Sequence, residues 1–171
     1  MGLSLLLGTA VCAEAATISW SGASGGSWFV ASNWSPAQVP TSADDVVIDA
    51  NVVVTVPGGS PSISFNTLTL GDAGRSFTPT LKVSASAATT GLVTVNSGAV
   101  FQQDTSSQIS FGGVSVLPGG MLTHTANSSA RSFLLNLSVS GDFDLQAGAS
   151  IAVSGLGYAG GGFNGPGYGP G

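Results

Sequence analysis

Short segments of alternating apolar and polar residues recur along most of the chain. Five of them consist of an aliphatic residue, a small or polar residue and a second aliphatic residue, at 68–70, 93–95, 114–116, 137–139 and 151–153. Successive side chains of a strand point to opposite faces, so each segment is expected to be a strand with one buried face. No stretch after Ala15 keeps a helical apolar spacing long enough for a stable helix, so the pattern predicts an all-β fold.

The spacing of these segments indicates a repeat. The numbering advances by 21 from Val95 to Val116 and by 23 from Val116 to Val139, but by only 14 from Val139 to Val153. A loose repeat of strand, turn and strand, with glycine at the corners, is typical of a parallel β-solenoid whose coils stack about 4.8 Å apart. An antiparallel β-sandwich also has short strands separated by frequent turns, and it is the alternative fold.

The solenoid interpretation predicts which side chains form the core. The expected inward rows are Leu68, Leu70, Val93, Val95, Val114, Val116, Leu137, Val139, Ile151 and Val153. Serine and threonine would then occupy the outward rows.

The composition limits the possible functions. Only 6% of the 171 residues are charged, and the only cations besides His124 are Arg75, Lys82 and Arg131. Three scattered cations cannot line a groove for nucleic acid, so nucleic-acid binding is excluded. A single cysteine, Cys12, excludes both an internal disulfide and a cysteine-based zinc site.

Residues 1–15 resemble a secretory signal peptide. Residues 3–11 form an apolar run that is too short to span a bilayer, and Ala13-Glu14-Ala15 has small residues at the positions that a signal peptidase reads. No lysine or arginine precedes the run, and the alternatives are a buried N-terminal strand or a lipoprotein modified at Cys12. The prediction is cleavage after Ala15 and a secreted or cell-surface protein.

A block of aromatic residues and several glycine-rich segments resemble a known group of proteins. The block comprises 20–28, 31–36 and 39–48, and the later segments are 119–124 and 148–158. They are similar to the opening module and the coils of large secreted bacterial surface proteins of the filamentous-haemagglutinin and autotransporter-passenger types. The resemblance implies a right-handed parallel β-helix. The predicted organisation is a Trp-rich cap with the first strands over 16–56, solenoid coils over 57–154 and, from its glycine content, a flexible tail over 155–171 of a longer protein.

Trp20, Trp28 and Trp34 are the first candidate functional residues. Three large apolar side chains close together can cover the open end of a solenoid, which otherwise exposes its core and unpaired strand edges. Alternatively, the same aromatics form a platform on which sugar rings stack. The cap is the favoured interpretation.

Carboxylates and one histidine are the remaining candidates. Asp44, Asp45 and Asp49 could contribute oxygens to Ca²⁺, although a polar turn before a strand explains them better. Asp142 and Asp144, two apart on a predicted strand, would have a separation near that of an inverting glycosidase. His124 is flanked by threonines and is expected to point outward into solvent.

Together these observations predict a non-catalytic extracellular structural or adhesive module. No catalytic residue, cofactor or metal is assigned, and the expected partners are extracellular polysaccharide or the surface of another cell. The alternative function is a carbohydrate-binding protein, or a polysaccharide lyase or glycoside hydrolase on the same β-helix.

Overall fold

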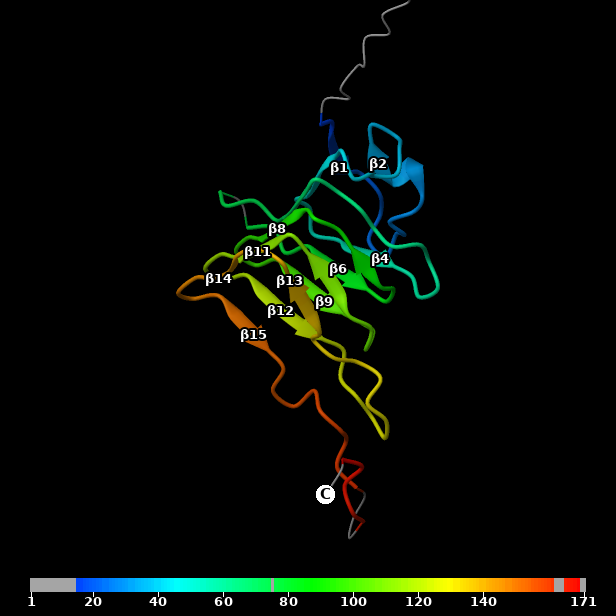
Figure 1. Ribbon diagram of the computed structural model, residues 1–171, viewed down its shortest axis with the longest axis vertical. Helices are drawn as coiled ribbons and strands as arrows, with labels where there is room; N and C mark the ends of the chain where they lie inside the picture. Colours follow the sequence, from blue (N-terminus) through cyan, green and yellow to red (C-terminus); the bar gives the residue numbers. More distant parts are fainter. Residues whose placement is uncertain (1–14, 75, 162–164, 170–171) are drawn as a thin grey trace, which may run out of the picture.

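The structure, a computed structural model, describes residues 15–74, 76–161 and 165–169. Its strands stack in parallel and form a β-solenoid of about five turns with almost no helix (Figure 1). A solenoid places each strand beside its equivalent from the next coil, and all neighbouring strands in the described ranges except β1 and β2 run parallel. The prediction of a parallel β-solenoid is therefore confirmed, and the antiparallel sandwich is wrong.

Three sheets form the walls of the solenoid. The first sheet contains β1 (Thr17–Trp20), β2 (Trp34–Ser35), β3 (Asp45–Ile48), β5 (Thr67–Leu70), β8 (Leu92–Val95), β11 (Gly113–Val116) and β14 (Phe143–Leu145). The second contains β4 (Val53–Val56), β6 (Thr80–Val83), β9 (Val100–Gln103), β12 (Met121–His124) and β15 (Ser150–Ala152). The third contains β7 (Ala87–Ala88), β10 (Ile109–Phe111) and β13 (Leu137–Val139). A short 3₁₀ helix, η1 (Ala31–Asn33), precedes β2.

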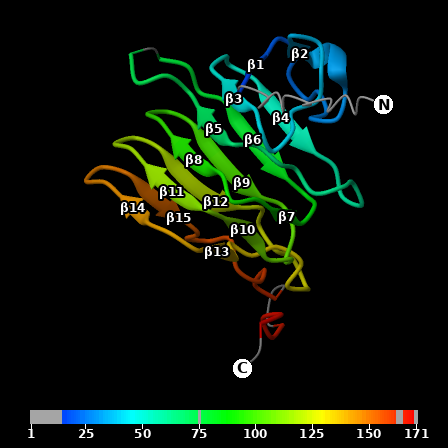
Figure 2. The same ribbon diagram turned by 45° about the horizontal axis from the view of Figure 1, so that its top comes forward.

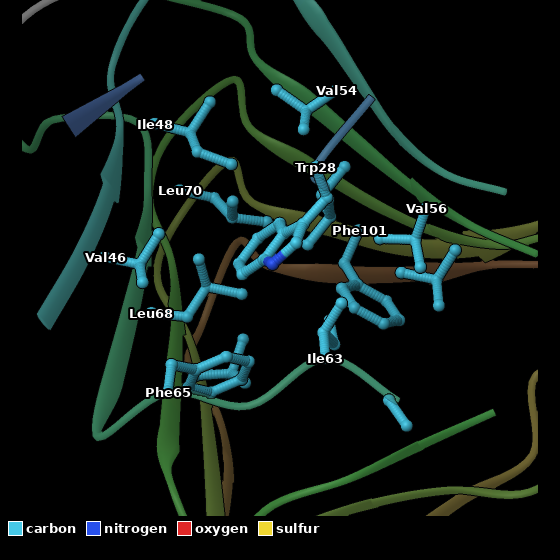
Figure 3. Close-up of a cluster of buried hydrophobic side chains, with 14 of the residues drawn as sticks. Trp28, Val46, Ile48, Val54, Val56, Ile63, Phe65, Leu68, Leu70 and Phe101 are labelled. Carbon is cyan, nitrogen blue, oxygen red and sulfur yellow. The ribbon is translucent and has the colours of Figure 1, made fainter. Parts of the chain in front are cut away.

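Aliphatic rows run through the interior along the stack. In the first sheet, strand register aligns Val46, Leu68, Val93 and Val114 in one row, and Ile48, Leu70, Val95 and Val116 in the next. All of these side chains are at most 2% exposed. Figure 3 shows the interior from one side, with Val54, Val56 and Phe101 of the second sheet facing Val46 and Leu68. The predicted core is thus confirmed for Leu68, Leu70, Val93, Val95, Val114 and Val116.

The last coil departs from the predicted core. Ile151 and Val153 are 43% and 42% exposed, and Leu137 and Val139 are only partly buried. Ile151 still pairs in register with buried Leu122. Among the described residues no further coil covers this row, so the prediction that Ile151 and Val153 are buried is wrong.

One step of the predicted repeat joins strands of two different sheets. Val116 pairs with Leu145 in the first sheet, whereas Val139 pairs with Phe111 in the third sheet. The step from Val116 to Val139 therefore joins two different walls. The 125–136 segment lengthens this coil, and its extra residues hid the true spacing.

Glycines allow close approach between coils at the corner that joins the third sheet to the first. A Cβ atom on Gly112 would lie 1.8 Å from the carbonyl oxygen of Thr90, and one on Gly91 would lie 2.6 Å from that of Phe65. The Gly112 amide donates to the Gly91 carbonyl at 3.0 Å, and the Gly141 amide donates to the Gly112 carbonyl at 2.7 Å. Any side chain at Gly112 would force these backbones apart.

The described part of the tail contacts the body of the protein. The amide of Asn127 donates to the carbonyl of Leu156 at 3.0 Å, and the amide of Ala159 donates to that of Ser128 at 2.9 Å. The predicted signal peptide, with Cys12, lies almost wholly outside the described residues. Within the described ranges, no helix has the length and apolar character needed to cross a bilayer.

Candidate functional site

The three tryptophans form one buried cluster at the N-terminal end of the stack. The ring centroids of Trp20 and Trp34 are 4.9 Å apart at 89°, and those of Trp28 and Trp34 are 4.9 Å apart at 73°. The indole N–H of Trp34 donates to the carbonyl of Trp28 at 2.7 Å, and that of Trp20 donates to the carbonyl of Gly22 at 2.8 Å. These edge-to-face contacts fix the rings relative to one another.

This cluster covers the first coil. Trp20, Trp28 and Trp34 are 6%, 0% and 2% exposed, and the ring of Trp28 reaches into the interior above Leu68 and Phe65 (Figure 3). The antiparallel pairing of β2 with β1 covers the edge of the first sheet at the same end. A sugar ring stacks on an exposed aromatic face, so the burial of all three rings favours the cap over the sugar platform.

The carboxylates of Asp44 and Asp45 accept hydrogen bonds from other residues of the protein. Oδ2 of buried Asp44 accepts from the amide and the hydroxyl of Thr41 at 2.8 and 2.7 Å. Oδ1 of Asp45 accepts from Asn66 Nδ2 and Thr67 Oγ1 in the next coil, at 2.9 and 2.7 Å. Asp44 therefore closes the turn before β3, and Asp45 ties two coils together.

Asp49 lies apart from this pair. It lines a shallow hollow of about 330 Å³ beside Thr69 and Asp72. Among residues 15–74, 76–161 and 165–169, no three His, Cys, Asp or Glu side chains gather as they would around a metal ion. The polar-turn interpretation accounts for the contacts of Asp44, whereas those of Asp45 join β3 to the next coil.

Asp142 and Asp144 lie on the rim of the last coil. Asp142 immediately precedes β14, whereas Asp144 lies within this strand. Both residues line an open groove of about 600 Å³ on the outer side of the first sheet. Oδ2 of Asp144 accepts from Gln146 Nε2 at 2.9 Å.

His124 is buried, so the prediction of an outward, solvated side chain is wrong. It is 9% exposed and pairs in register with fully buried Gln103. Its Nδ1 lies 2.7 Å from the carbonyl oxygen of Thr125. The alternation in β12 indicates this burial, because Leu122 points inward and His124, two positions later, lies on the same face.

A charged cluster that the sequence analysis missed joins three coils on the outside of the second sheet. Asp104 Oδ2 accepts from Ser84 Oγ at 2.9 Å and lies 3.3 Å from Lys82 Nζ. Asp104 Oδ1 accepts from the hydroxyl of Thr125, which in turn accepts from Gln102 Nε2 at 2.7 Å. The steps in numbering from Lys82 to Asp104 and from Asp104 to Thr125 match the coil repeat, which was the available signal.

Burial and hydrogen bonding act in opposite directions on Asp104. Partial burial raises the pKa of its carboxyl group, but hydrogen bonds from Thr125 and Ser84, with the ammonium of Lys82, lower it by more. The net effect is a pKa below the ordinary value of 3.8. Asp104 is therefore held as a carboxylate that bridges neighbouring coils.

A groove on the outer side of the third sheet gathers hydroxyl groups from successive coils. It has a volume of about 490 Å³. Its lining residues are Ser42, Ser64, Thr89, Thr90, Ser110, Phe111, Ser138 and Ser140. Strand register places Ser110 beside Ser138 of the next coil. None of these lining side chains is charged, and the Thr89 hydroxyl already donates to the carbonyl of Phe65 at 3.0 Å, so a neutral ligand here would meet mainly the serine hydroxyls and apolar surface.

Comparisons with protein-family models, with curated proteins and with solved structures found no match to this chain.

Proposed function

We propose that this protein is a non-catalytic extracellular module whose function is structural or adhesive. The observation that supports the proposal is the parallel stack itself, in which charged side chains join one coil to the next and hydroxyl side chains line the outer groove. Such a stack supplies a rigid body and a repeated neutral surface, which suits weak contacts made many times over.

The roles of the carboxylates favour this function over catalysis. Asp45 and Asp104 each accept hydrogen bonds from side chains of neighbouring coils, and Asp44 closes a turn. A general acid or base must instead reach a substrate proton. Their contacts are those of groups that stabilise the fold.

Export is part of the proposal. The apolar run 3–11 and Ala13-Glu14-Ala15 would direct secretion and leave Ala16 as the first residue. The test is the intact mass of the protein recovered outside the producing cell. A mass that begins at Ala16 supports export with cleavage, and an exported mass that retains Met1 contradicts the cleavage.

Incubation with pectin, alginate and chitin tests the absence of catalysis. The expected result is no new reducing ends and no unsaturated products. Turnover that disappears in Asp142→Ala or Asp144→Ala would overturn the proposal, because these exposed acids would then act on substrate. Thr90→Ala, on the same groove, is the matched control for a change of surface without loss of a carboxylate.

The second candidate function is carbohydrate binding without turnover, and the hydroxyl-lined groove favours it. Co-sedimentation with insoluble polysaccharide would measure this binding. Ser110→Arg would place a large charged side chain in the groove and abolish binding there, while Thr69→Arg, on the outer side of the first sheet, would leave it unchanged. If Trp34→Ala removed binding in a folded protein and Ser110→Arg did not, the sugar site would lie at the tryptophans instead.

A further inference from the structure

Asn127 uses its side chain to bind backbone groups of two different segments. It lies in 125–136, between β12 and β13, which we call the excursion. Its Oδ1 accepts from the amides of Ser132 and Phe133 at 2.7 and 2.8 Å, and its Nδ2 donates to the carbonyl of Phe133 at 2.9 Å. The same Nδ2 donates to the carbonyl of Leu156, beyond β15, at 3.1 Å. One carboxamide therefore folds the excursion and also holds a later segment of the chain.

The later segment is 154–159, which we call the strap. The amide of Asn127 donates to the carbonyl of Leu156 at 3.0 Å, and the amide of Ala159 donates to the carbonyl of Ser128 at 2.9 Å. Figure 2 shows the tail, in orange to red, leaving the stack at the end where the excursion lies. In the described part of the chain, the hydrogen bonds that join the strap to the excursion thus all meet at Asn127 and Ser128.

The strap has the features of a segment that opens independently of the coils. A Cβ atom added to Gly155 or Gly157, on either side of Leu156, would meet no atom within 4 Å. Gly155 also has a φ of +73°, a conformation that glycine adopts without strain. Leu156 is only partly buried, and its neighbours in the strap are exposed. Little buried apolar area and few hydrogen bonds therefore oppose local opening of the strap.

We propose that the strap opens and closes against the excursion and that the carboxamide of Asn127 is its latch. Closing requires a donor at Nδ2, because both groups that Nδ2 faces are carbonyl oxygens. A carboxylate at this position would still accept from the amides of Ser132 and Phe133, but it would set an oxygen against the carbonyl of Leu156. The strap would then open while the excursion stayed folded.

The latch also controls the two tyrosines of the chain, Tyr158 and Tyr168. Tyr158 belongs to the strap, and the amide of Tyr168 donates to the carbonyl of Ala159 at 3.3 Å. A Cβ atom on Gly169 would lie 3.3 Å from Cδ2 of Tyr158, so the chain folds back on the strap there. Opening at Asn127 would therefore free both tyrosines from the body of the protein and leave the strand pairing of the coils in place.

Amide hydrogen exchange of the full chain, read by mass spectrometry of its peptides, tests the latch. In Asn127→Asp the amide of Ala159 should exchange about five- to ten-fold faster than in the parent protein, whereas the amides of Ser132 and Phe133 keep their protection. Asn127→Ala should speed exchange in both segments, because it removes the accepting and the donating bonds together.

Asn136→Asp is the matched control. It makes the same chemical change in the same excursion, where Nδ2 of Asn136 donates only to the carbonyl of Ser106, at 3.4 Å. Exchange in the strap should be unchanged in this variant. The melting temperature of the coils should be the same in Asn127→Asp and in the control, since the strap opens without loss of strand pairing.

Two results would overturn the proposal. One is unchanged exchange of the strap in Asn127→Asp. The other is equal acceleration in the strap and the excursion, which would make Asn127 a structural residue of the excursion only. If Asn127→Asp did not fold, Ala159→Pro would decide, because it removes the donor to Ser128 from the strap itself. Faster exchange of the strap with a protected excursion is again the expected result, and an unchanged strap contradicts the proposal.

Discussion

The coil of β11 and β12 and the last coil of β14 and β15 have the same apolar pattern but bury it to different extents. Val116 is fully buried, whereas Leu145, its partner in the same row, is 43% exposed. Leu122 and Ile151 differ in the same way, at 1% and 43%. The difference teaches that in a solenoid the stability contributed by a side chain depends on whether a neighbouring coil covers it.

The largest effect is expected from a carboxylate placed in the buried row of β11. Val116→Asp would bury an unpaired charge in the apolar interior and should lower the free energy of unfolding by on the order of 4 kcal/mol. Urea denaturation measures the loss. The outward variant Ser115→Asn, at the preceding position, is the control and should change the midpoint little; asparagine is used because an aspartate there would face Asp144 in register. Equal losses in the two variants would show that the assigned register is wrong.

A methyl group at the glycine corner should have the next largest effect. Gly112→Ala would place Cβ 1.8 Å from a backbone carbonyl of the preceding coil, so the coils must separate. Overpacking of this kind costs roughly 3 kcal/mol. Gly157→Ala, where nothing lies within 4 Å of the added methyl group, is the matched control and should melt at nearly the same temperature as the parent protein. A Gly112→Ala protein as stable as the control would contradict the close approach.

Removal of the Asp104 carboxylate, which bridges neighbouring coils, should have a smaller effect on stability that depends on pH. Asp104→Asn should lower the free energy of unfolding by about 1 kcal/mol at pH 7, because it removes the charge that Lys82, Ser84 and Thr125 stabilise. Asp144→Asn in the exposed last coil, with its hydrogen bond from Gln146, is the control and should change it by less than about 0.5 kcal/mol.

The sign of the pH dependence follows from the lowered pKa of Asp104. The folded protein holds this carboxyl deprotonated at lower pH than the unfolded chain does. Its contribution is therefore fully present above the unfolded pKa, near pH 4, and is lost as pH falls through the lower folded pKa. Denaturation midpoints between pH 5 and pH 2 should fall less steeply for Asp104→Asn than for the parent protein. Parallel curves would contradict the stabilising role of the charge.

The smallest effect is expected in the last coil. Leu145→Asp should change the free energy of unfolding by less than about 1 kcal/mol, because the carboxylate stays in water. Urea denaturation measures this change. A loss as large as that of Val116→Asp would mean that another part of the protein covers Leu145.

The sequence indicated which residues matter in the candidate site, but mostly not which of them contact one another. The three tryptophans were expected to form a cap, and their burial agrees with that expectation. Asp44 and Asp45 were expected in a polar turn; the hydrogen bonds of Asp44 with Thr41 agree, whereas Asp45 begins β3 and its side chain bonds to the next coil. The Asp104 cluster was missed, because its members are separated by whole coils and meet only after the coils stack.

The sequence alone predicted five of the strands, most of their inward faces and a loose repeat whose step from Val95 to Val116 is correct. Two-residue alternation fixes which side chains share a face, and the step from Val95 to Val116 is one true coil, as their pairing in register shows. The same alternation also predicts that His124 points inward, although the threonines on either side favoured an outward, solvated side chain.

Only the tertiary structure decided which segment stacks on which and what each row buries. The sequence could not show that Val139 belongs to the third sheet, because a longer excursion before it changes the spacing without changing the local pattern. Nor could it show that Ile151 is exposed while Leu122 is buried, since both have the same alternating neighbours. Alternation is a property of a single strand, whereas burial depends on the coil on the other side.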